Sequence, residues 1–257
     1  MLFLRSLIFY LGMALCTVII TVPTPLIVLL PYRWRYAILT QWSRVVLHWL
    51  RITCKLDFAV EGREHIPKRA AIIFCKHQSA WETLALQRVF PPQAWVLRRS
   101  LFMIPFFGWG LWAMDPVGID RGAGRKALNE VVEGGTARLK KGRWVVVFPE
   151  GTRVPPGKRA QYRIGGAILA SKSGFPVVPV AHNGGEFWPK KGGFLKPPGT
   201  VKMVIGPPIN SAGVEPNELM QRAETWIEAQ MERITAERFK TDGRITYYSR
   251  EKAGEQA

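Results

Sequence analysis

The chain has 257 residues, and 36 Lys and Arg against 19 Asp and Glu give it a formal net charge of +17. With 47% hydrophobic and 11% aromatic residues it is not a disordered basic tail, and three cysteines exclude a disulfide scaffold. The positive charge predicts an anionic partner, for which nucleic acid, an anionic membrane or an acidic protein would each serve.

An almost continuous apolar run occupies residues 7–30, and no Asp, Glu, Lys, Arg or His occurs between Arg5 and Arg33. As a helix rising about 1.5 Å per residue, this run reaches across a bilayer core about 30 Å thick. A cleaved signal peptide would have a shorter apolar region ending at a small-residue cleavage site, so a retained anchor is favoured. Pro23 and Pro25 would break or kink a helix, which leaves open one span or two membrane-inserted pieces.

Residues 33–51 are predicted to form one amphipathic helix after this run. At a helical period one face carries Trp34, Ile38, Trp42, Val45 and Trp49. A separate stripe carries Arg33, Arg44 and Arg51. Tryptophan opposite arginine is typical of a helix in the headgroup region of a membrane, although an ordinary helix packed on the domain would share the pattern. No acidic residue precedes Asp57, so the positive-inside rule predicts that the rest of the chain is cytoplasmic.

From about residue 55 onward, short apolar or β-branched runs alternate with helical patterns. The runs predict strands over residues 56–60, 70–75, 94–97, 144–148, 177–180 and 201–205. The helical patterns predict helices over residues 81–89, 124–140, 164–173 and 217–239. This alternation predicts an α/β fold with a largely parallel or mixed sheet. The polar tail from about Ser249 is expected to fray.

His77 stands out among the four histidines because it follows the strand predicted over residues 70–75. Open α/β sheets place their sites just beyond the carboxyl ends of strands. Glu82 would face about 140° away from His77 in a continuous helix, so a pair needs His77 in the loop and Glu82 in the first helical turn. Such a carboxylate would fix the imidazole tautomer and leave the other nitrogen as a general base. Ser79 and Glu82 match a capping box equally well.

Three further polar segments follow apolar stretches. The F-P-E-G-T-R run at residues 148–153 offers a close backbone approach, a hydroxyl and a guanidinium, which suit a phosphate, although a plain β-turn would look the same. Asp120 and Arg121 could equally be a simple surface pair. Arg98 and Arg99 precede an aromatic run, which fits either a core turn or a lipid with a charged head and an apolar tail.

In chain order, the blocks H-x4-acid, R-x-L-x-x-I-P-x-x-G, I-D-R, F-P-E-G-T-R and V-P-V resemble those of the glycerolipid acyltransferase family. The resemblance covers about residues 56–210, and F-P-E-G-T-R is highly specific for the family. It implies an α/β fold, a glycerol-3-phosphate acyltransferase-like mixed sheet flanked by helices, after an N-terminal membrane-embedded helical anchor. Glu82 departs from the family pattern, which has Asp there; it keeps the charge and adds one methylene, so it reads as a tolerated variant.

The same resemblance implies an enzyme that transfers an acyl chain from acyl-CoA or acyl carrier protein to the 2-hydroxyl of lysophosphatidate, giving phosphatidate in phospholipid biosynthesis. His77 would be the general base and Glu82 would orient it, with no cofactor and no metal. The acceptor would be bound by Arg98, Arg99, Arg121, Glu150, Gly151, Thr152 and Arg153. Within this set, Glu150 is expected to orient Arg153 or the acceptor.

The chain is therefore expected to divide into an anchor with an interfacial helix at residues 1–54, an acyltransferase domain at 55–245 and a polar tail at 246–257. The basic flank of the anchor predicts an anionic inner (cytoplasmic) membrane, with the catalytic domain on its cytoplasmic side. Open alternatives are another lysolipid acceptor, a membrane-tethered basic binding protein and an inactive lipid-binding homologue. Nucleic acid ranks last, because no long basic run or RNA-binding motif occurs.

Overall fold

The computed structural model describes residues 1–120, 122–190, 192–240 and 248. The N-terminal helices are α1 (Leu2–Thr21), α2 (Thr24–Ile27), α3 (Tyr32–Leu39) and α4 (Gln41–Cys54). The strands are β1 (Leu56–Glu61), β2 (Ile72–Cys75), β3 (Gln93–Arg98), β4 (Val117–Ile119), β5 (Trp144–Val147), β6 (Val177–His182) and β7 (Gly199–Ile205). The remaining α-helices are α5 (Trp81–Val89), α6 (Phe107–Ala113), α7 (Arg125–Lys140), α8 (Gly165–Ser173) and α9 (Pro216–Ile234).

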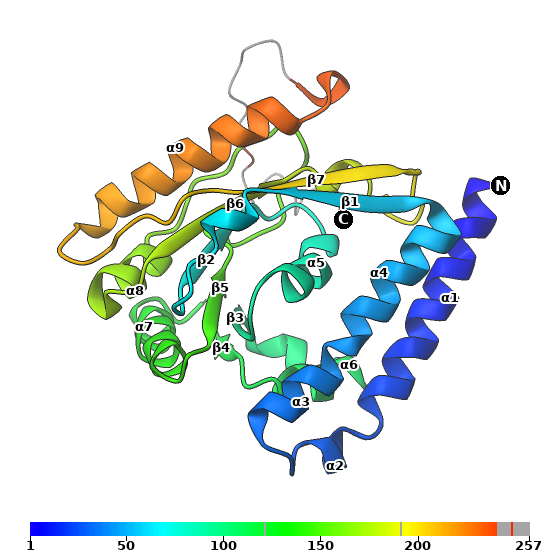
Figure 1. Ribbon diagram of the computed structural model, residues 1–257, viewed down its shortest axis with the longest axis horizontal. Helices are drawn as coiled ribbons and strands as arrows, with labels where there is room; N and C mark the ends of the chain where they lie inside the picture. The colour runs from blue at the N-terminus through cyan, green and yellow to red at the C-terminus, as the bar shows by residue number, and fades with distance from the viewer. Residues whose placement is uncertain (121, 191, 241–247, 249–257) are drawn as a thin grey trace.

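The seven strands form one mixed sheet in the order β1-β7-β6-β2-β5-β3-β4, in which β6 and β7 are antiparallel and the other neighbours parallel. Figure 1 shows α4 and α5 on one face of the sheet and α7, α8 and α9 on the other. The central strands β2 and β5 are buried on both faces and apolar at every position. In β2, Ile73 and Cys75 belong to the core on the α4 and α5 side, whereas Ile72 and Phe74 belong to the core under α8 and α9.

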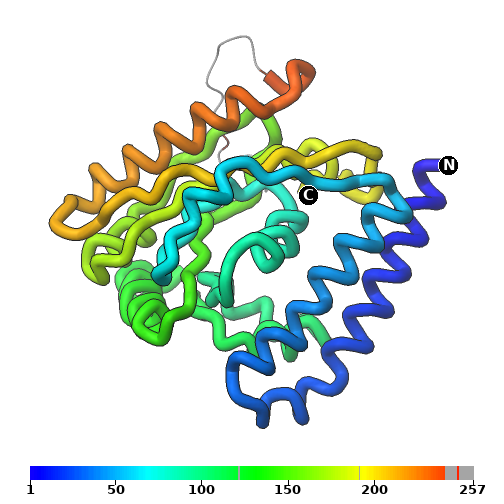
Figure 2. The backbone as a smooth tube through the Cα atoms, in the orientation of Figure 1, coloured from blue at the N-terminus to red at the C-terminus, as the bar shows by residue number. Residues whose placement is uncertain are grey.

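The apolar N-terminal run breaks where its prolines predict. Helix α1 ends at Thr21, and α2 begins at Thr24 with Pro23 as its N-cap residue and Pro25 in its first turn. Helix α1 is the one helix among the described residues that is long and apolar enough to cross a membrane. It lies side by side with α4, which Figure 2 shows as two neighbouring tubes.

The predicted single helix over residues 33–51 is wrong, because it divides into α3 and α4 at Thr40. The Thr40 hydroxyl donates to the carbonyl of Tyr36 at 2.7 Å, a type of bond that bends helices. The predicted tryptophan face divides too. Trp34 is exposed, but Trp42 Nε1 donates to the Thr17 hydroxyl at 2.9 Å and Trp49 Nε1 donates to the backbone of α1. Only part of that face is thus open to a membrane.

Two elements lie outside the sequence predictions, and one helix is shorter than predicted. Strand β4 has only three residues, and α6 carries Gly108, where a Cβ atom would come within 2.2 Å of the Phe102 carbonyl oxygen. Helix α9 ends at Ile234, before an extended Thr235.

The predicted polar tail, residues 246–257, lies outside the described residues apart from Tyr248. The N-terminal helices share a core with the sheet, since Phe9 and Leu50 pack in the cluster that contains Trp81.

Candidate active site

His77 lies in the loop between β2 and α5, and its imidazole meets the carboxylate of Glu82 in the first turn of α5. Nδ1 of His77 lies 2.6 Å from Oε1 of Glu82. The Glu82 side chain is fully buried, whereas 12% of the His77 side chain is exposed. A buried carboxylate on Nδ1 holds the proton on that nitrogen, so Nε2 is the nitrogen left to accept another. This is the loop-and-first-turn geometry that the pairing requires.

The same Glu82 oxygen also caps α5. Oε1 accepts the backbone N–H of Ser79 at 3.1 Å, and the Ser79 hydroxyl accepts the backbone N–H of Trp81 at 3.0 Å. The Ser79 hydroxyl in turn donates to the carbonyl of Trp188 at 2.7 Å. The capping interaction and the histidine–carboxylate pair are therefore not alternatives, because one oxygen serves both.

A second buried histidine, His182, lies behind Glu82. Its Nε2 donates to the carbonyl of Lys76 at 2.8 Å and lies 3.8 Å from Oε2 of Glu82, and its Nδ1 accepts the N–H of Gly184. Burial lowers the pKa of His182, although the Glu82 carboxylate opposes that shift. Burial raises the pKa of Glu82, but His182 and the hydrogen bond from His77 outweigh it, and the net pKa is lowered. Glu82 is therefore ionised at neutral pH.

The F-P-E-G-T-R segment follows β5 and lies against His77. The ring of Phe148 stacks on the imidazole with centroids 4.0 Å apart, and the backbone N–H of Val154 donates to the His77 carbonyl at 2.7 Å. Gly151 has φ of 62°, in the left-handed region that favours glycine. Thr152 and Arg153 beside it are half-buried. The structure thus brings together the two segments that the sequence singled out most strongly.

Glu150 is buried beneath His77 rather than turned toward Arg153. Its Oε2 accepts the backbone N–H of His77 at 2.8 Å, and its Oε1 lies 2.7 Å from Nζ of Lys76. The expected contact with Arg153 is absent, and among the described residues Arg153 has no carboxylate partner. Sequence reasoning missed Lys76. Its signal was a lysine at the end of an apolar strand, directly before the candidate base.

Two of the remaining predicted site residues, Arg98 and Arg99, lie at the same edge of the sheet. Strands β2, β3, β4 and β5 run parallel, so their carboxyl ends meet at one edge. Arg98 ends β3 and is exposed, and Arg99 donates to Glu130 at 3.0 Å and to the carbonyl of Gly118 at 3.1 Å. Arg121 lies outside the described residues. Within the described part of the chain, no group of three or more His, Cys, Asp and Glu could hold a metal ion.

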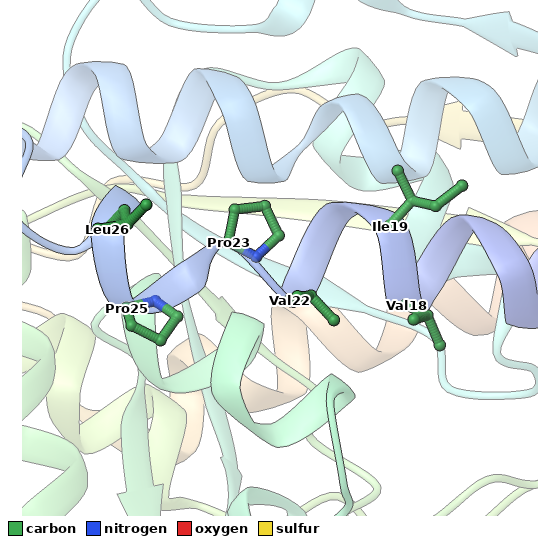
Figure 3. Close-up of a pocket in the computed structure, with 6 residues that line it drawn as sticks. All are labelled: Val18, Ile19, Val22, Pro23, Pro25 and Leu26. Atoms are coloured by element: carbon green, nitrogen blue, oxygen red, sulfur yellow. The ribbon is translucent and has the colours of Figure 1, made fainter.

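An apolar hollow of about 550 Å³ opens at the junction of α1 and α2 (Figure 3). It is lined by Val18, Ile19, Val22, Pro23, Pro25 and Leu26. Its lining is almost wholly apolar, which suits contact with hydrocarbon. It is therefore separate in chemistry from the polar site around His77.

A histidine–carboxylate pair beside a glycine-containing turn, at the carboxyl edge of a mixed α/β sheet, is an arrangement suited to general-base catalysis. The family model described as Acyltransferase matches residues 57–183. The 1-acyl-sn-glycerol-3-phosphate acyltransferase of Pseudomonas aeruginosa is 43% identical over 211 residues, which are 80% of this chain and 82% of that protein. The chain belongs to the acyltransferase family.

More distant relatives agree with this assignment. The 1-acyl-sn-glycerol-3-phosphate acyltransferase of Saccharomyces cerevisiae is 32% identical over 147 residues, which are 55% of this chain and 48% of that protein. The crystal structure of the 1-acyl-sn-glycerophosphate acyltransferase PlsC from Thermotoga maritima has 27% identity and a TM-score of 0.73, over 90% of this chain and 95% of that one. The family resemblance and the mixed-sheet fold are confirmed, while the roles of the individual site residues stay predictions.

Proposed function

We propose that this acyltransferase moves an acyl chain from acyl-CoA or acyl carrier protein to the sn-2 hydroxyl of lysophosphatidic acid, and so makes phosphatidic acid for phospholipid biosynthesis. The observation that carries the proposal is the 2.6 Å contact between His77 Nδ1 and the buried Glu82, which leaves Nε2 as the basic nitrogen. The acceptor class is supported by the name of the P. aeruginosa relative, 1-acyl-sn-glycerol-3-phosphate acyltransferase.

In the proposed reaction, Nε2 of His77 takes the proton of the acceptor hydroxyl as its oxygen attacks the thioester carbon. The tetrahedral intermediate then collapses, the carbon–sulfur bond breaks, and the imidazolium returns the proton to the leaving thiolate. The ionised Glu82 stabilises that imidazolium through Nδ1–H. Positioned bases of this kind typically contribute about 10²–10⁴-fold, and no covalent acyl-enzyme is required.

The acceptor's phosphate is proposed to lie between the ends of β3 and β5. Arg153 is half-buried next to the Gly151–Thr152 turn, and Arg98 is exposed at the end of β3. Guanidinium groups bind phosphate oxygens through paired hydrogen bonds, which suits this acceptor. From the family resemblance, Arg121 is assigned to the phosphate as well, and Arg99 contributes positive charge nearby. The contacts of Glu150 with Lys76 and His77 support a role in positioning the base rather than in binding the acceptor.

Membrane association is proposed to occur through α1, whose outer face exposes apolar side chains. These include Phe3, Leu4, Leu11, Leu15 and Ile19. Helices α3 and α4 carry arginine and no acidic residue, which favours an anionic leaflet and the cytoplasmic side of an inner membrane. An enzyme held there would receive its lysolipid from the leaflet and its thioester from the cytoplasm.

The proposal is tested with the full-length protein in detergent and a panel of lysolipids, each offered with labelled acyl-CoA and acyl carrier protein. We expect the highest kcat/KM with lysophosphatidic acid, and a rate for His77→Ala that is lower by about 10²-fold or more. His48→Ala is the matched control, because His48 is an exposed histidine on α4. Preference for a lysolipid without a terminal phosphate would contradict lysophosphatidic acid as the acceptor. Full activity of His77→Ala would contradict the role of His77 as the general base.

A further inference from the structure

Lys76 is a fully buried lysine that stands directly before His77 and bridges two carboxylates. Its Nζ lies 2.7 Å from Oε1 of Glu150 and 2.7 Å from Oε1 of Glu228, and its side chain is 1% exposed. Buried charges are costly unless they are paired and hydrogen-bonded. A lysine paired on both sides at this depth therefore holds Glu150 and Glu228 at a fixed separation.

The main chain at His77 is held on three sides. Glu150 accepts its N–H at 2.8 Å, the N–H of Val154 donates to its carbonyl at 2.7 Å, and His182 donates to the preceding carbonyl of Lys76 at 2.8 Å. These bonds leave the loop backbone little freedom before α5 begins. The place of the imidazole relative to Glu82 therefore depends on where Glu150 is held.

Glu228 is the outermost member of this chain of contacts, and it comes from a different part of the sequence. It lies on α9, beyond the matched family segment of residues 57–183, and is 5% exposed. Its Oε1 also accepts the hydroxyl of Tyr162 at 2.9 Å, and its Oε2 lies 3.3 Å from Nε of Arg159. Glu228 is thus fixed by two side chains besides Lys76.

We infer that Glu228 is a positioning residue for acyl transfer, which acts through Lys76 and Glu150 to fix the backbone of His77. Without its carboxylate, Lys76 would keep one carboxyl partner instead of two in a buried site. Its flexible side chain would then be free to move, and Glu150 would move with it. A shift of about 1 Å in a catalytic group can cost 10²-fold in rate, so the effect should reach kcat.

This inference rests on the proposed role of His77 as the general base. It is tested by steady-state kinetics of Glu228→Leu and Glu228→Gln in the full-length protein, at a temperature where each is folded by circular dichroism. We expect kcat to fall about tenfold or more in Glu228→Leu, with KM for lysophosphatidic acid unchanged. Glu228→Gln keeps an acceptor for Tyr162 and Lys76, so it should recover part of kcat.

Two control variants on α9 separate positioning from general loss of stability. Met220→Ala creates a core cavity two turns away, and Glu218→Gln removes an exposed carboxylate. Both should keep the kcat of the unmodified protein. Equal kcat in Glu228→Leu and Met220→Ala would overturn the inference, and so would a change confined to KM. If Glu228→Leu does not fold, unchanged kcat in Glu228→Gln overturns it.

A double-mutant cycle tests whether the effect passes through Lys76. If Glu228 acts only through this lysine, Lys76→Met with Glu228→Gln should lose no more kcat than Lys76→Met alone. Losses that multiply would show independent actions and overturn the inference. His77→Ala distinguishes failure of the proposed mechanism from failure of the inference about Glu228. Full activity in His77→Ala overturns the proposed mechanism, whereas a strongly impaired His77→Ala with fully active Glu228 variants overturns only the role of Glu228.

Discussion

Nδ1 of His77 lies 2.6 Å from Oε1 of Glu82, and that same oxygen accepts the backbone N–H of Ser79 at 3.1 Å. The contact therefore ties the candidate base to the first turn of α5 rather than to a mobile loop. A carboxylate held by a helix cap keeps its place before substrate arrives, and such preorganisation is what a general base requires.

Glu82→Gln should lower kcat by about 10²–10⁴-fold, because a neutral amide cannot stabilise the imidazolium and can hold the wrong tautomer. The free energy of unfolding should be affected less than kcat, since the amide oxygen can still accept the N–H of Ser79. Glu82→Asp keeps the charge and loses one methylene, so it should retain more activity than Glu82→Gln. Steady-state kinetics and thermal unfolding of both variants check this. Equal activity in the two variants would show that the charge has no catalytic role.

Arg153→Ala should raise KM for lysophosphatidic acid by about 10–100-fold, because a charge-assisted hydrogen bond is typically worth about 1.5–3 kcal/mol. The rise should be small for a neutral monoacylglycerol, which has no phosphate for the guanidinium to bind. Arg222→Ala, which removes an exposed arginine on α9, is the matched control. An equal effect of Arg153→Ala on both acceptors would argue that Arg153 does not bind the phosphate.

Glu150 should make stability fall as pH rises through neutrality. Burial raises the pKa of Glu150 to about 7, in spite of the nearby Lys76, and Glu228 adds to the rise. A carboxyl whose pKa is about 4.5 when unfolded and about 7 when folded favours the folded state below pH 4.5 and loses that contribution as pH rises through 7. Glu150→Gln cannot titrate and should lack this component.

Thermal unfolding of the two proteins between pH 5 and about 8 measures this difference. As pH increases, the Tm of the unmodified protein should fall relative to the Tm of Glu150→Gln. A difference in Tm that stays constant, or moves in the opposite direction, would mean that Glu150 is already ionised throughout this range. Lys76 stays protonated, because Glu150 and Glu228 together outweigh the effect of burial and raise its pKa.

The elements that could be predicted from the sequence are those whose burial shows in the residues of a single short segment. The runs that become β2 and β5 are apolar at every position, because both faces of those strands are covered. Strand β4 was missed because its three residues include Gly118, and it is a strand only through pairing with β3. The division at Thr40 was missed because a helical period continues across it.

In the candidate site, too, only contacts between residues close in sequence could be predicted. His77 and Glu82 are five residues apart, so their pairing could be tested by helix geometry alone. The partners behind them could not be found in this way, because Glu228 meets Lys76 across 152 residues and His182 meets Lys76 across 106. Local pattern shows which residues are buried, but it does not show which distant residue completes a buried charge.

The central claim is that His77 is the base in acyl transfer, and single-turnover kinetics test it most directly. Excess protein is mixed with labelled lysophosphatidic acid and acyl thioester, and the rate for His77→Ala is compared with that for His48→Ala. We predict that His77→Ala loses about 10²-fold or more in rate while it still binds the acceptor, and that His48→Ala reacts at the unmodified rate. A rate in His77→Ala equal to that of His48→Ala would contradict the account.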